Sequence, residues 1–381
     1  MTLPVKAFVG AKIHDGTAVH EGCALTIDND GACRIIPQND VPENCTTEHL
    51  SGGIITPGFV DLQVNGGGGI MFNDDQSVDA LRTIAQAHAI TGTVALLPTL
   101  ITDTAEKTRA AIDAAEQAIK QGVNGILGIH LEGPHLSVAR KGAHDPSLIR
   151  TMDEDDLNLI LDAAQRLPNV KVTVAPESTS LSQIRAMADA GIIVSLGHTD
   201  ADFDTCMAAF DAGASCVTHL YNAMSQLGNR EPGLVGAVLS RRDVFAGVIA
   251  DGIHVHPSSI RLALDAKPDS DKIFLVSDAM AVAGSKVQQF TLNGRQVTRN
   301  ANRLTLPDGT LAGADLELSQ AISVMISSVE DSERQAIARA TSIPASMLRR
   351  RNGFGSLAHT SSGVIYARDL MNSGVRYLAA H

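Results

Sequence analysis

Eight short apolar runs, rich in β-branched residues, constrain the fold of this 381-residue chain more than any other feature. Longer stretches with the apolar spacing of amphipathic helices separate one run from the next. A near-continuous apolar run is typical of a strand that is buried on both faces of a parallel sheet. Eight such strands alternating with helices predict an α/β fold, a closed (β/α)₈ barrel of the TIM type rather than an open doubly wound sheet. The runs occupy residues 54–64, 93–99, 125–133, 171–177, 192–200, 216–222, 244–251 and 272–279.

Helical apolar spacing marks the stretches between these runs and returns near the end of the chain. After the eighth run, the dipeptides Asn293-Gly294 and Asp308-Gly309 are hairpin signals, which predict an inserted β-structure. The predicted helices cover residues 76–91, 103–121, 153–166, 181–190, 202–212, 232–240, 258–267, 315–330, 332–340 and 344–350.

The two ends of the chain differ in character from its centre. Residues 1–53 hold short apolar runs punctuated by Gly, Asp and Asn, and residues 355–381 return to similar strand-like runs. We therefore expect the N- and C-terminal segments to form a small split β-sandwich domain. Residues 54–354 are expected to form the barrel domain.

Composition and charge exclude several classes of function. The net charge of −12 argues against a nucleic-acid or membrane-surface partner, because both need a basic face. The five cysteines are odd in number and form no CxxC motif, so neither a disulfide framework nor a cysteine zinc site is expected. No apolar run has signal-peptide length or reaches the roughly 18 residues of a membrane span. These features predict a soluble, cytoplasmic protein that acts on a small molecule.

Polar residues stand at the end of nearly every predicted barrel strand. Barrel enzymes build their active sites at the carboxyl ends of the strands, so these side chains should share one rim. A random set of apolar strands would rarely end in this way, and the pattern predicts a catalytic site. The residues are Gln63, Asn65, Thr99, Glu132, Glu177, His198, His219, Asp251 and Asp278.

Two histidines and a glutamate within this set predict a metal site. His198 and His219 lie 21 residues apart, one strand-helix unit, so they should project from adjacent strands. With Glu132 they make a ligand set for a divalent transition metal that keeps an open position for water. Asp278, at the end of the eighth strand, is predicted to be the general acid/base that takes a proton from the attacking water and delivers it to the leaving amine.

Other polar residues have weaker signals when they are taken singly. By residue type alone, His144 and His254 are expected to be ordinary surface histidines. Arg230, on the loop after the sixth strand and near the rim, is a candidate for binding an anionic group.

A set of motifs resembles one known family. PGFVDLQVNGGGG, HLEGP with KGAH downstream, LGHTDA, THLYNAM, REPG, ADGIHV and LVSDA occur in this order between about residues 50 and 320. Together they resemble the N-acetylglucosamine-6-phosphate deacetylases of the amidohydrolase superfamily. The resemblance implies hydrolysis of the acetamide of N-acetylglucosamine 6-phosphate to glucosamine 6-phosphate and acetate, in a homodimer.

The resemblance also implies roles for individual residues. Glu132, His198 and His219 would hold the metal, and Asp278 would be the catalytic acid/base. His144 would help to polarise the acetamide carbonyl. The phosphate would lie against Asn222, Ala223 and Arg230, the last supplied by the neighbouring subunit, and His254 would contact a sugar hydroxyl. The full set of expected substrate-binding residues is Gln63, Asn65, Ala143, Asn222, Ala223, Arg230, His254, Leu311, Ala312 and Gly313.

The end of the first strand departs from the pattern of many amidohydrolases. They carry an HxH motif there, which supports a second metal, whereas this chain has Gln63-x-Asn65. Amide side chains are poor ligands beside imidazoles. We therefore predict one divalent ion per subunit, with zinc as the expected metal and iron, manganese or cobalt as the alternatives.

Three alternative functions stay open. One is deacetylation of N-acetylgalactosamine 6-phosphate, since a single hydroxyl contact could decide between the two epimers. Another is a cyclic amidohydrolase of the dihydroorotase or hydantoinase kind, against which the missing HxH motif argues. The last is a barrel without catalysis, against which the presence of Glu132, His198, His219 and Asp278 argues.

Overall fold

The computed structural model describes residues 6–357, 363–369 and 374–378. Its centre is a parallel sheet with the strand order β8-β11-β12-β13-β14-β15-β16-β17. Each of the eight predicted runs overlaps one of these strands, so the predicted strand count is confirmed. The strands are β8 (Phe59–Val64), β11 (Thr93–Ile101), β12 (Ile129–Glu132), β13 (Val170–Val174), β14 (Ile193–Leu196), β15 (Cys216–Val217), β16 (Phe245–Val248) and β17 (Ile273–Leu275).

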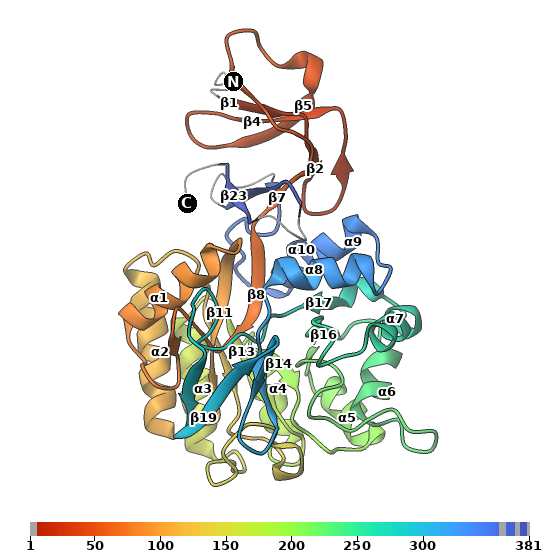
Figure 1. The fold of residues 1–381 in the computed structure, drawn as a ribbon. Helices are drawn as coiled ribbons and strands as arrows, with labels where there is room; N and C mark the ends of the chain where they lie inside the picture. The colour runs from red at the N-terminus through yellow and green to blue at the C-terminus, as the bar shows by residue number, and fades with distance from the viewer. Residues whose placement is uncertain (1–5, 358–362, 370–373, 379–381) are drawn as a thin grey trace.

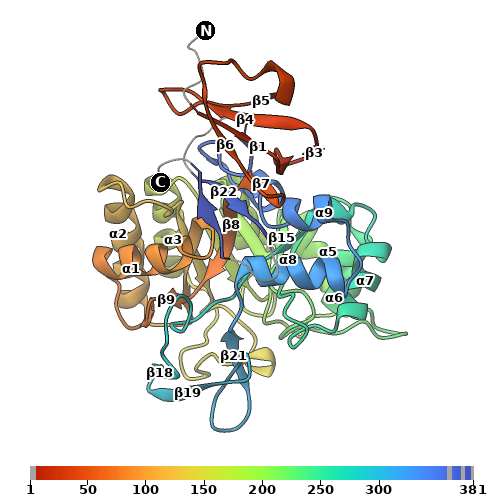
Figure 2. The ribbon, with the colours of Figure 1, turned by 45° about the horizontal axis from the view of Figure 1, so that its top comes forward.

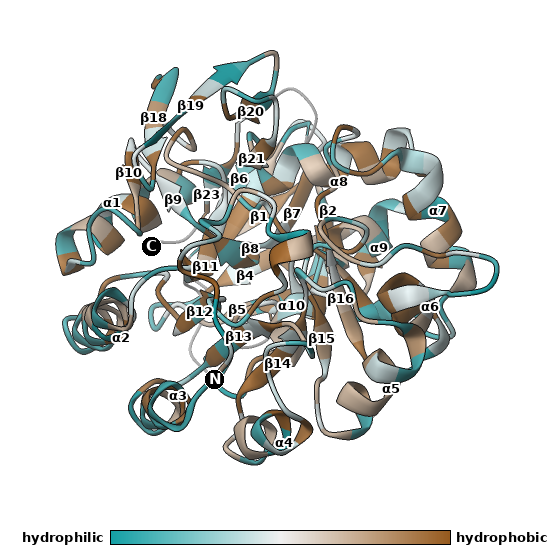
Figure 3. Ribbon diagram, turned by 90° about the horizontal axis from the view of Figure 1, so that it is seen from below, coloured by the Kyte–Doolittle hydropathy of each residue, from teal (hydrophilic) through white to brown (hydrophobic). Residues whose placement is uncertain are grey.

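The sheet closes between its first and last strands. Beyond the end of β17, Ala279 forms a parallel bridge with Val64, and the Asn65 amide donates to the carbonyl of Ala279 at 2.9 Å. Helices surround the ring of strands when the molecule is viewed along the barrel (Figure 3), and buried helix residues such as Ile112 and Ile160 belong to the same apolar core as the strands. The predicted (β/α)₈ barrel is therefore confirmed.

All ten predicted helices are present. Side-chain caps fix where several begin: the hydroxyls of Ser77 and Thr104 and the carboxylate of Asp153 accept the first free backbone N–H groups. The helices are α1 (Val78–Ala89), α2 (Ala105–Lys120), α3 (Glu154–Arg166), α4 (Leu181–Asp189), α5 (Phe203–Asp211), α6 (Gly233–Ser240), α7 (Pro257–Ala266), α8 (Leu318–Ser327), α9 (Glu333–Ala338) and α10 (Ser342–Met347). In the described part of the chain, no helix is both long and apolar enough to cross a bilayer.

The two chain ends form a second unit beside the barrel (Figure 1). Phe8 and Leu25 from one sheet pack with Ile13, Ile55 and Val364 from the other in a common apolar core. Such packing makes a β-sandwich, and the predicted split sandwich is confirmed. One sheet has the order β5 (Cys33–Pro37), β4 (Cys23–Ile27), β1 (Lys6–Val9), β6 (Thr46–His49); the other has β23 (Arg376–Tyr377), β22 (Val364–Ala367), β7 (Ile54–Pro57), β2 (Lys12–His14), β3 (Val19–His20).

The first predicted barrel run is in fact two strands. β7 pairs with β2 and β22 in the sandwich, and only β8 belongs to the barrel. Gly58 separates them in a crowded place, since a Cβ there would lie 2.3 Å from Val94 and 2.8 Å from the carbonyl of Gly363. The sequence run was continuous because both strands are buried, which hid the change of sheet.

An antiparallel insertion follows the barrel, at the end opposite the sandwich (Figure 2). It consists of β18 (Gln289–Leu292), β19 (Arg295–Asn300), β20 (Arg303–Thr305) and β21 (Leu311–Ala314). Its first hairpin turns at Asn293 and Gly294, both with positive φ, as predicted. Apolar residues of the insertion pack on Met71 and Met280, so it is anchored to the barrel rim. A further hairpin at this rim joins β9 (Gly66–Gly67) to β10 (Ile70–Met71).

Candidate active site

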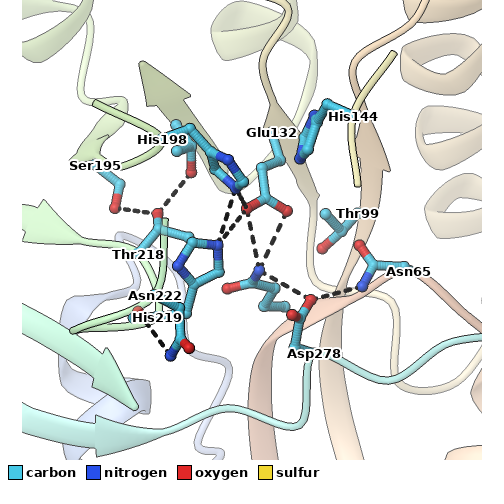
Figure 4. Close-up of polar contacts among 12 residues, drawn as sticks. Asn65, Thr99, Glu132, His144, Ser195, His198, Thr218, His219, Asn222 and Asp278 are labelled. Atoms are coloured by element: carbon cyan, nitrogen blue, oxygen red, sulfur yellow. Dashed lines mark hydrogen bonds and ion pairs between the residues drawn. The ribbon is translucent and has the colours of Figure 1, made fainter. Parts of the chain in front are cut away.

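Three potential metal ligands converge at the carboxyl ends of β12, β14 and β15. Oε1 of Glu132 lies 3.2 Å from Nε2 of His198 and 3.0 Å from Nε2 of His219. The two Nε2 atoms are 3.1 Å apart, and all three side chains are buried (Figure 4). The structure therefore brings together the three residues that the sequence singled out as metal ligands.

The chemistry of these donor atoms fits a divalent cation. Nδ1 of His198 lies 2.8 Å from the Arg140 carbonyl at the end of the 3₁₀ helix η2 (Val138–Arg140). A carbonyl only accepts hydrogen bonds, so this nitrogen carries the proton and Nε2 presents a lone pair. A second imidazole and a carboxylate face the same point, and the three ligand atoms lie within 4.8 Å of one another. Two nitrogens and one carboxylate oxygen match a three-ligand site with an open position.

Contacts inside the cluster shift the pKa values of Glu132 and His219 against the effect of burial. Burial raises the pKa of the Glu132 carboxyl, but hydrogen bonding to His198 and His219 outweighs it and holds this pKa well below its usual range. Burial lowers the pKa of His219, but its contact with Glu132 more than offsets this and raises it. The carboxylate is therefore charged and ready to bind a cation.

Backbone strain marks the same positions. His198, His219 and Asp278 have φ angles of 48°, 32° and 50°, in the left-handed region that non-glycine residues rarely occupy. Each such residue costs about 1–3 kcal/mol, and such residues cluster at functional sites. Here all three lie just beyond a barrel strand and project into one cavity.

Asp278 lies opposite the ligand cluster and is held by two amide side chains. Nδ2 of Asn65 donates to Oδ1 of Asp278 at 2.7 Å, and Nε2 of Gln63 donates to the same oxygen at 3.0 Å. Nε2 of Gln63 also lies 3.2 Å from Oε2 of Glu132. Burial and then the charge of Glu132 raise the pKa of Asp278, which suits a group that must both accept and release a proton.

His144 also faces the cavity, although its sequence signal alone indicated a surface position. Its ring lies 4.4 Å from that of His198, centroid to centroid, and Nδ1 lies 2.7 Å from the hydroxyl of Thr102. Burial, and then the proximity of His198, lowers the pKa of His144 well below its usual value. The side chain is therefore a neutral imidazole beside the ligand cluster.

Thr102 was missed because the second strand is longer than predicted. β11 continues through Pro98 to Ile101, whereas the sequence interpretation ended it at Thr99. Thr99 consequently lies deeper in the barrel, where its hydroxyl accepts from the amide of Val64 at 3.0 Å. The predicted run had already passed Pro98, and the buried residues Leu100 and Ile101 extend the strand beyond its predicted end.

A cavity of about 250 Å³ opens above Glu132 and Asp278. Its wall includes apolar residues that the sequence interpretation did not select, because apolar side chains on loops carry no chemical signal. Predicted residues that line it are Asn65, Glu132, Ala143, His144, His198, His219, Asn222, Ala223, His254, Asp278, Leu311 and Gly313. The additional ones are Ile101, Gly142, Ile249, Met280 and Thr310.

Three predicted substrate-binding residues do not line the cavity. Gln63 is fully buried below it, between Glu132 and Asp278. Ala312 faces the apolar cluster under the insertion, because side chains alternate along β21 and Leu311 takes the cavity side. Arg230 is exposed on its loop, away from the cavity of its own chain.

Two further strand-end carboxylates orient the surrounding loops. Asp251 accepts from the backbone amide of His254 and lies 2.6 Å from Nδ1 of the same residue. This contact fixes the ring and leaves its Nε2 available at the cavity. Glu177 accepts from the Thr199 hydroxyl at 2.5 Å and from the Asp200 amide at 2.7 Å, next to His198.

Comparisons with known proteins identify similar chains. The model of the amidohydrolase family matches residues 54–370. An N-acetylgalactosamine-6-phosphate deacetylase from Shewanella sp. (strain ANA-3) is 40% identical, over 90% of this chain and 86% of its own. An N-acetylglucosamine-6-phosphate deacetylase from Haemophilus influenzae is 33% identical, over 92% of each chain. The crystal structure of N-acetylglucosamine-6-phosphate deacetylase from Pasteurella multocida superposes with a TM-score of 0.91 at 34% identity, covering 97% of this chain and 96% of its own.

Proposed function

Because the chain belongs to the amidohydrolase family, we propose that it hydrolyses the acetamide of N-acetylglucosamine 6-phosphate, giving glucosamine 6-phosphate and acetate. The observation that carries this proposal is the buried cluster of Glu132, His198 and His219 facing Asp278 across one cavity. Such an arrangement is suited to metal-assisted hydrolysis of an amide. Deacetylases with 33% and 40% identity over most of the chain support the substrate class.

Membership of the family implies a divalent metal, and we propose that Glu132, His198 and His219 hold a single zinc ion per subunit. Iron, manganese and cobalt suit the same ligands. The amides of Gln63 and Asn65 stand where a second site would need imidazoles, and both hydrogen-bond to Asp278. When bound, a divalent ion supplies Lewis-acid polarisation of a water and of the acetamide carbonyl.

The remaining chemistry is assigned to side chains around the cavity. Asp278, held by two amides, takes the proton of the attacking water and then delivers it to the nitrogen of the departing amine. His144 lies beside the cluster, where its imidazole can stabilise the developing negative charge on the carbonyl oxygen. The apolar wall around the acetamide excludes bulk water, which strengthens both interactions.

Substrate binding is proposed for the residues nearer the mouth. Asn222, Ala223 and Arg230 would bind the phosphate, and His254, fixed by Asp251, would contact a sugar hydroxyl. Ala143, Leu311 and Gly313 would line the sugar. Arg230 is exposed and does not line its own cavity, which supports its donation to the neighbouring subunit of a homodimer. A cytoplasmic location and the absence of nucleic-acid or membrane partners stay predictions from the acidic composition.

The division into two domains is also proposed. The division predicted from the sequence has residues 1–53 with 355–381 as the small domain and residues 54–354 as the catalytic domain. Because β7 (Ile54–Pro57) pairs within the sandwich, we move the first boundary to residue 58.

Deacetylation of N-acetylgalactosamine 6-phosphate is the second candidate function. It is favoured by the Shewanella relative, which has the higher identity of the two relatives and carries that name. The two sugars differ only in the orientation of the hydroxyl at C4, so one contact in the cavity decides between them.

The test is acetate release from four compounds in parallel: N-acetylglucosamine and N-acetylgalactosamine, each with and without the 6-phosphate. Turnover of one phosphorylated sugar supports the proposal and identifies the epimer. Turnover of the free sugars alone would remove the phosphate site. If none of the four releases acetate from metal-loaded protein, the deacetylase assignment fails, and cyclic amides become the substrates to assay.

A further inference from the structure

The barrel closes unevenly along the seam between β8 and β17. Towards the sandwich end of the seam, each strand bonds to the segment that follows α9. The amide of Val60 donates to the Ala340 carbonyl, and the amide of Leu275 donates to the Arg339 carbonyl. The segment after α9 is therefore wedged between them. At the cavity end of the seam, the residues after β17 bond directly to β8, and the amide of Asp278 donates to the Gln63 carbonyl at 3.1 Å.

Asp61 lies between the part of the seam that holds the segment after α9 and the part where the two sides bond directly. Its side chain is fully buried, on the inward face of β8 below Gln63. The amide of Ser277 donates to its two carboxylate oxygens, at 3.3 and 3.2 Å, and the amide of Gln63 donates at 3.2 Å. The Asp61 carboxylate thus spans the gap between β8 and the residues after β17. It takes the place of a main-chain carbonyl as the acceptor for the amide of Ser277, the residue before Asp278.

The geometry at Asp278 makes this contact consequential. Asp278 has a φ of 50°, so its backbone must be held against relaxation. Its amide is fixed by Gln63, its carbonyl accepts from the Ala314 amide at 2.9 Å, and the preceding amide is fixed by Asp61. Without Asp61, the strained turn would keep the contact of Asp278 with Gln63 but lose the contact at Ser277, and the Asp278 carboxylate could move relative to the ligand cluster.

An acid at this position carries an electrostatic cost. Burial, and to a smaller extent the charge of Asp278, raises the pKa of Asp61 to about 7. A serine or threonine could accept an amide hydrogen without that repulsion. A carboxylate differs in its longer reach and in its two oxygens, which here hold backbone amides on both sides of the seam.

We propose that Asp61 is a positioning residue for the reaction: its carboxylate holds the Ser277 amide at the barrel seam and thereby keeps Asp278 aimed at the ligand cluster. This inference rests on the proposed role of Asp278 as the acid/base. It assigns to Asp61 no contact with the substrate or the metal.

The experiment compares Asp61→Ala and Asp61→Asn with Thr173→Val. Thr173 is a matched control inside the same barrel, since its hydroxyl lies 2.7 Å from both His130 and Thr218 and does not touch the seam. Each protein is assayed for metal content, melting temperature, kcat and KM, and for hydrogen exchange of the peptide that contains Ser277 and Asp278. Asp61→Asn keeps one acceptor oxygen and the side-chain volume, so it remains informative if the alanine variant fails to fold.

We expect Asp61→Ala to lower kcat on the order of 10²-fold, as a displacement of about 1 Å can, with KM within about threefold. The seam peptide should exchange faster, and metal content should stay at about one ion per chain. Asp61→Asn should fall between the alanine variant and wild type. Thr173→Val should lose melting temperature yet keep kcat within about threefold and seam exchange unchanged.

A kcat for both Asp61 variants that matches the control, or unchanged exchange of the seam peptide, would overturn the proposal. Loss of metal from the Asp61 variants would also overturn it, because the residue would then act through the ligands. If wild type releases no acetate from any amino sugar, the proposed function has failed, and the exchange measurement alone decides whether Asp61 holds this segment.

Discussion

Nε2 of His198 and Nε2 of His219 lie 3.1 Å apart, at the distance of a hydrogen bond that His198 cannot donate as a neutral imidazole. Its proton is committed to the Arg140 carbonyl through Nδ1. The orientation of His198 is therefore set from behind by the main chain, which is the usual way in which proteins fix a metal-ligating histidine. The ring of His198 is thereby directed toward Glu132 and His219.

Removal of one ligand should release the metal. His219→Ala leaves one imidazole and one carboxylate, so we expect metal affinity to fall at least 10-fold and turnover to fall with it. His49→Ala, on an exposed position of the sandwich, is the control and should keep wild-type metal content. Bound metal is measured after dialysis. Equal metal content in the two variants would contradict the assignment of His219 as a ligand.

The role of Asp278 can be separated from metal binding. Asp278→Asn keeps the size of the side chain but cannot accept a proton, so kcat should fall by about 10²–10⁴-fold. Metal content and melting temperature should stay near wild type, because Asp278 is not among the three ligands. Turnover close to that of wild type in this variant would exclude Asp278 as the acid/base.

Stability should depend on pH through Asp61. Burial raises its pKa to about 7 in the folded chain, against about 3.9 when unfolded. Between these values the folded chain holds a proton that the unfolded chain has released, so the free energy of unfolding falls as pH rises from about 4 to about 7 and then levels. Asp61→Asn cannot titrate and lacks this component.

Denaturant unfolding of the metal-free proteins at pH 4.5 and pH 8 provides the measurement. Wild type should lose more stability than Asp61→Asn over this interval. Parallel changes in the two proteins would show that Asp61 has an ordinary pKa.

Arg339 is expected to be a major stabilising residue. It is 1% exposed, pairs with Asp331 at 2.7 Å and donates to the carbonyl of Ile273 at 2.8 Å. Arg339→Met removes the cation that pairs with Asp331 and the donor to Ile273 beside the seam, and should cost about 3–5 kcal/mol in the free energy of unfolding. Arg261→Met, which breaks an exposed pair with Asp265, should cost less than about 1 kcal/mol. Equal losses in the two variants would contradict the assignment.

Shared active sites would give a distinctive result in mixed dimers. Arg230→Ala and Asp278→Asn should each be nearly inactive on the phosphorylated sugar. If Arg230 acts in the neighbouring subunit, random mixing of the two variants should restore about a quarter of wild-type activity, because half of the dimers carry one intact site. No restoration on mixing would place Arg230 outside a shared site.

Much of the barrel could be predicted because its strands are buried on both faces and therefore read as continuous apolar runs. Glu132, His198 and His219 were found because position at a strand end implies a common rim. Sequence could not show that the segment around Arg339 separates β8 from β17, since nothing local records a contact between chain segments far apart in sequence. Thr102 was missed for a local reason, the extension of β11 past Thr99 to Ile101.

The central claim is that one metal ion, held by Glu132, His198 and His219, supports deacetylation of an amino sugar phosphate. Stepwise addition of zinc to the metal-free protein, with acetate release followed at each step, tests it most directly. Activity should rise linearly and reach a plateau at about one ion per chain. Full turnover without added metal, or a plateau only at about two ions per chain, would contradict the account.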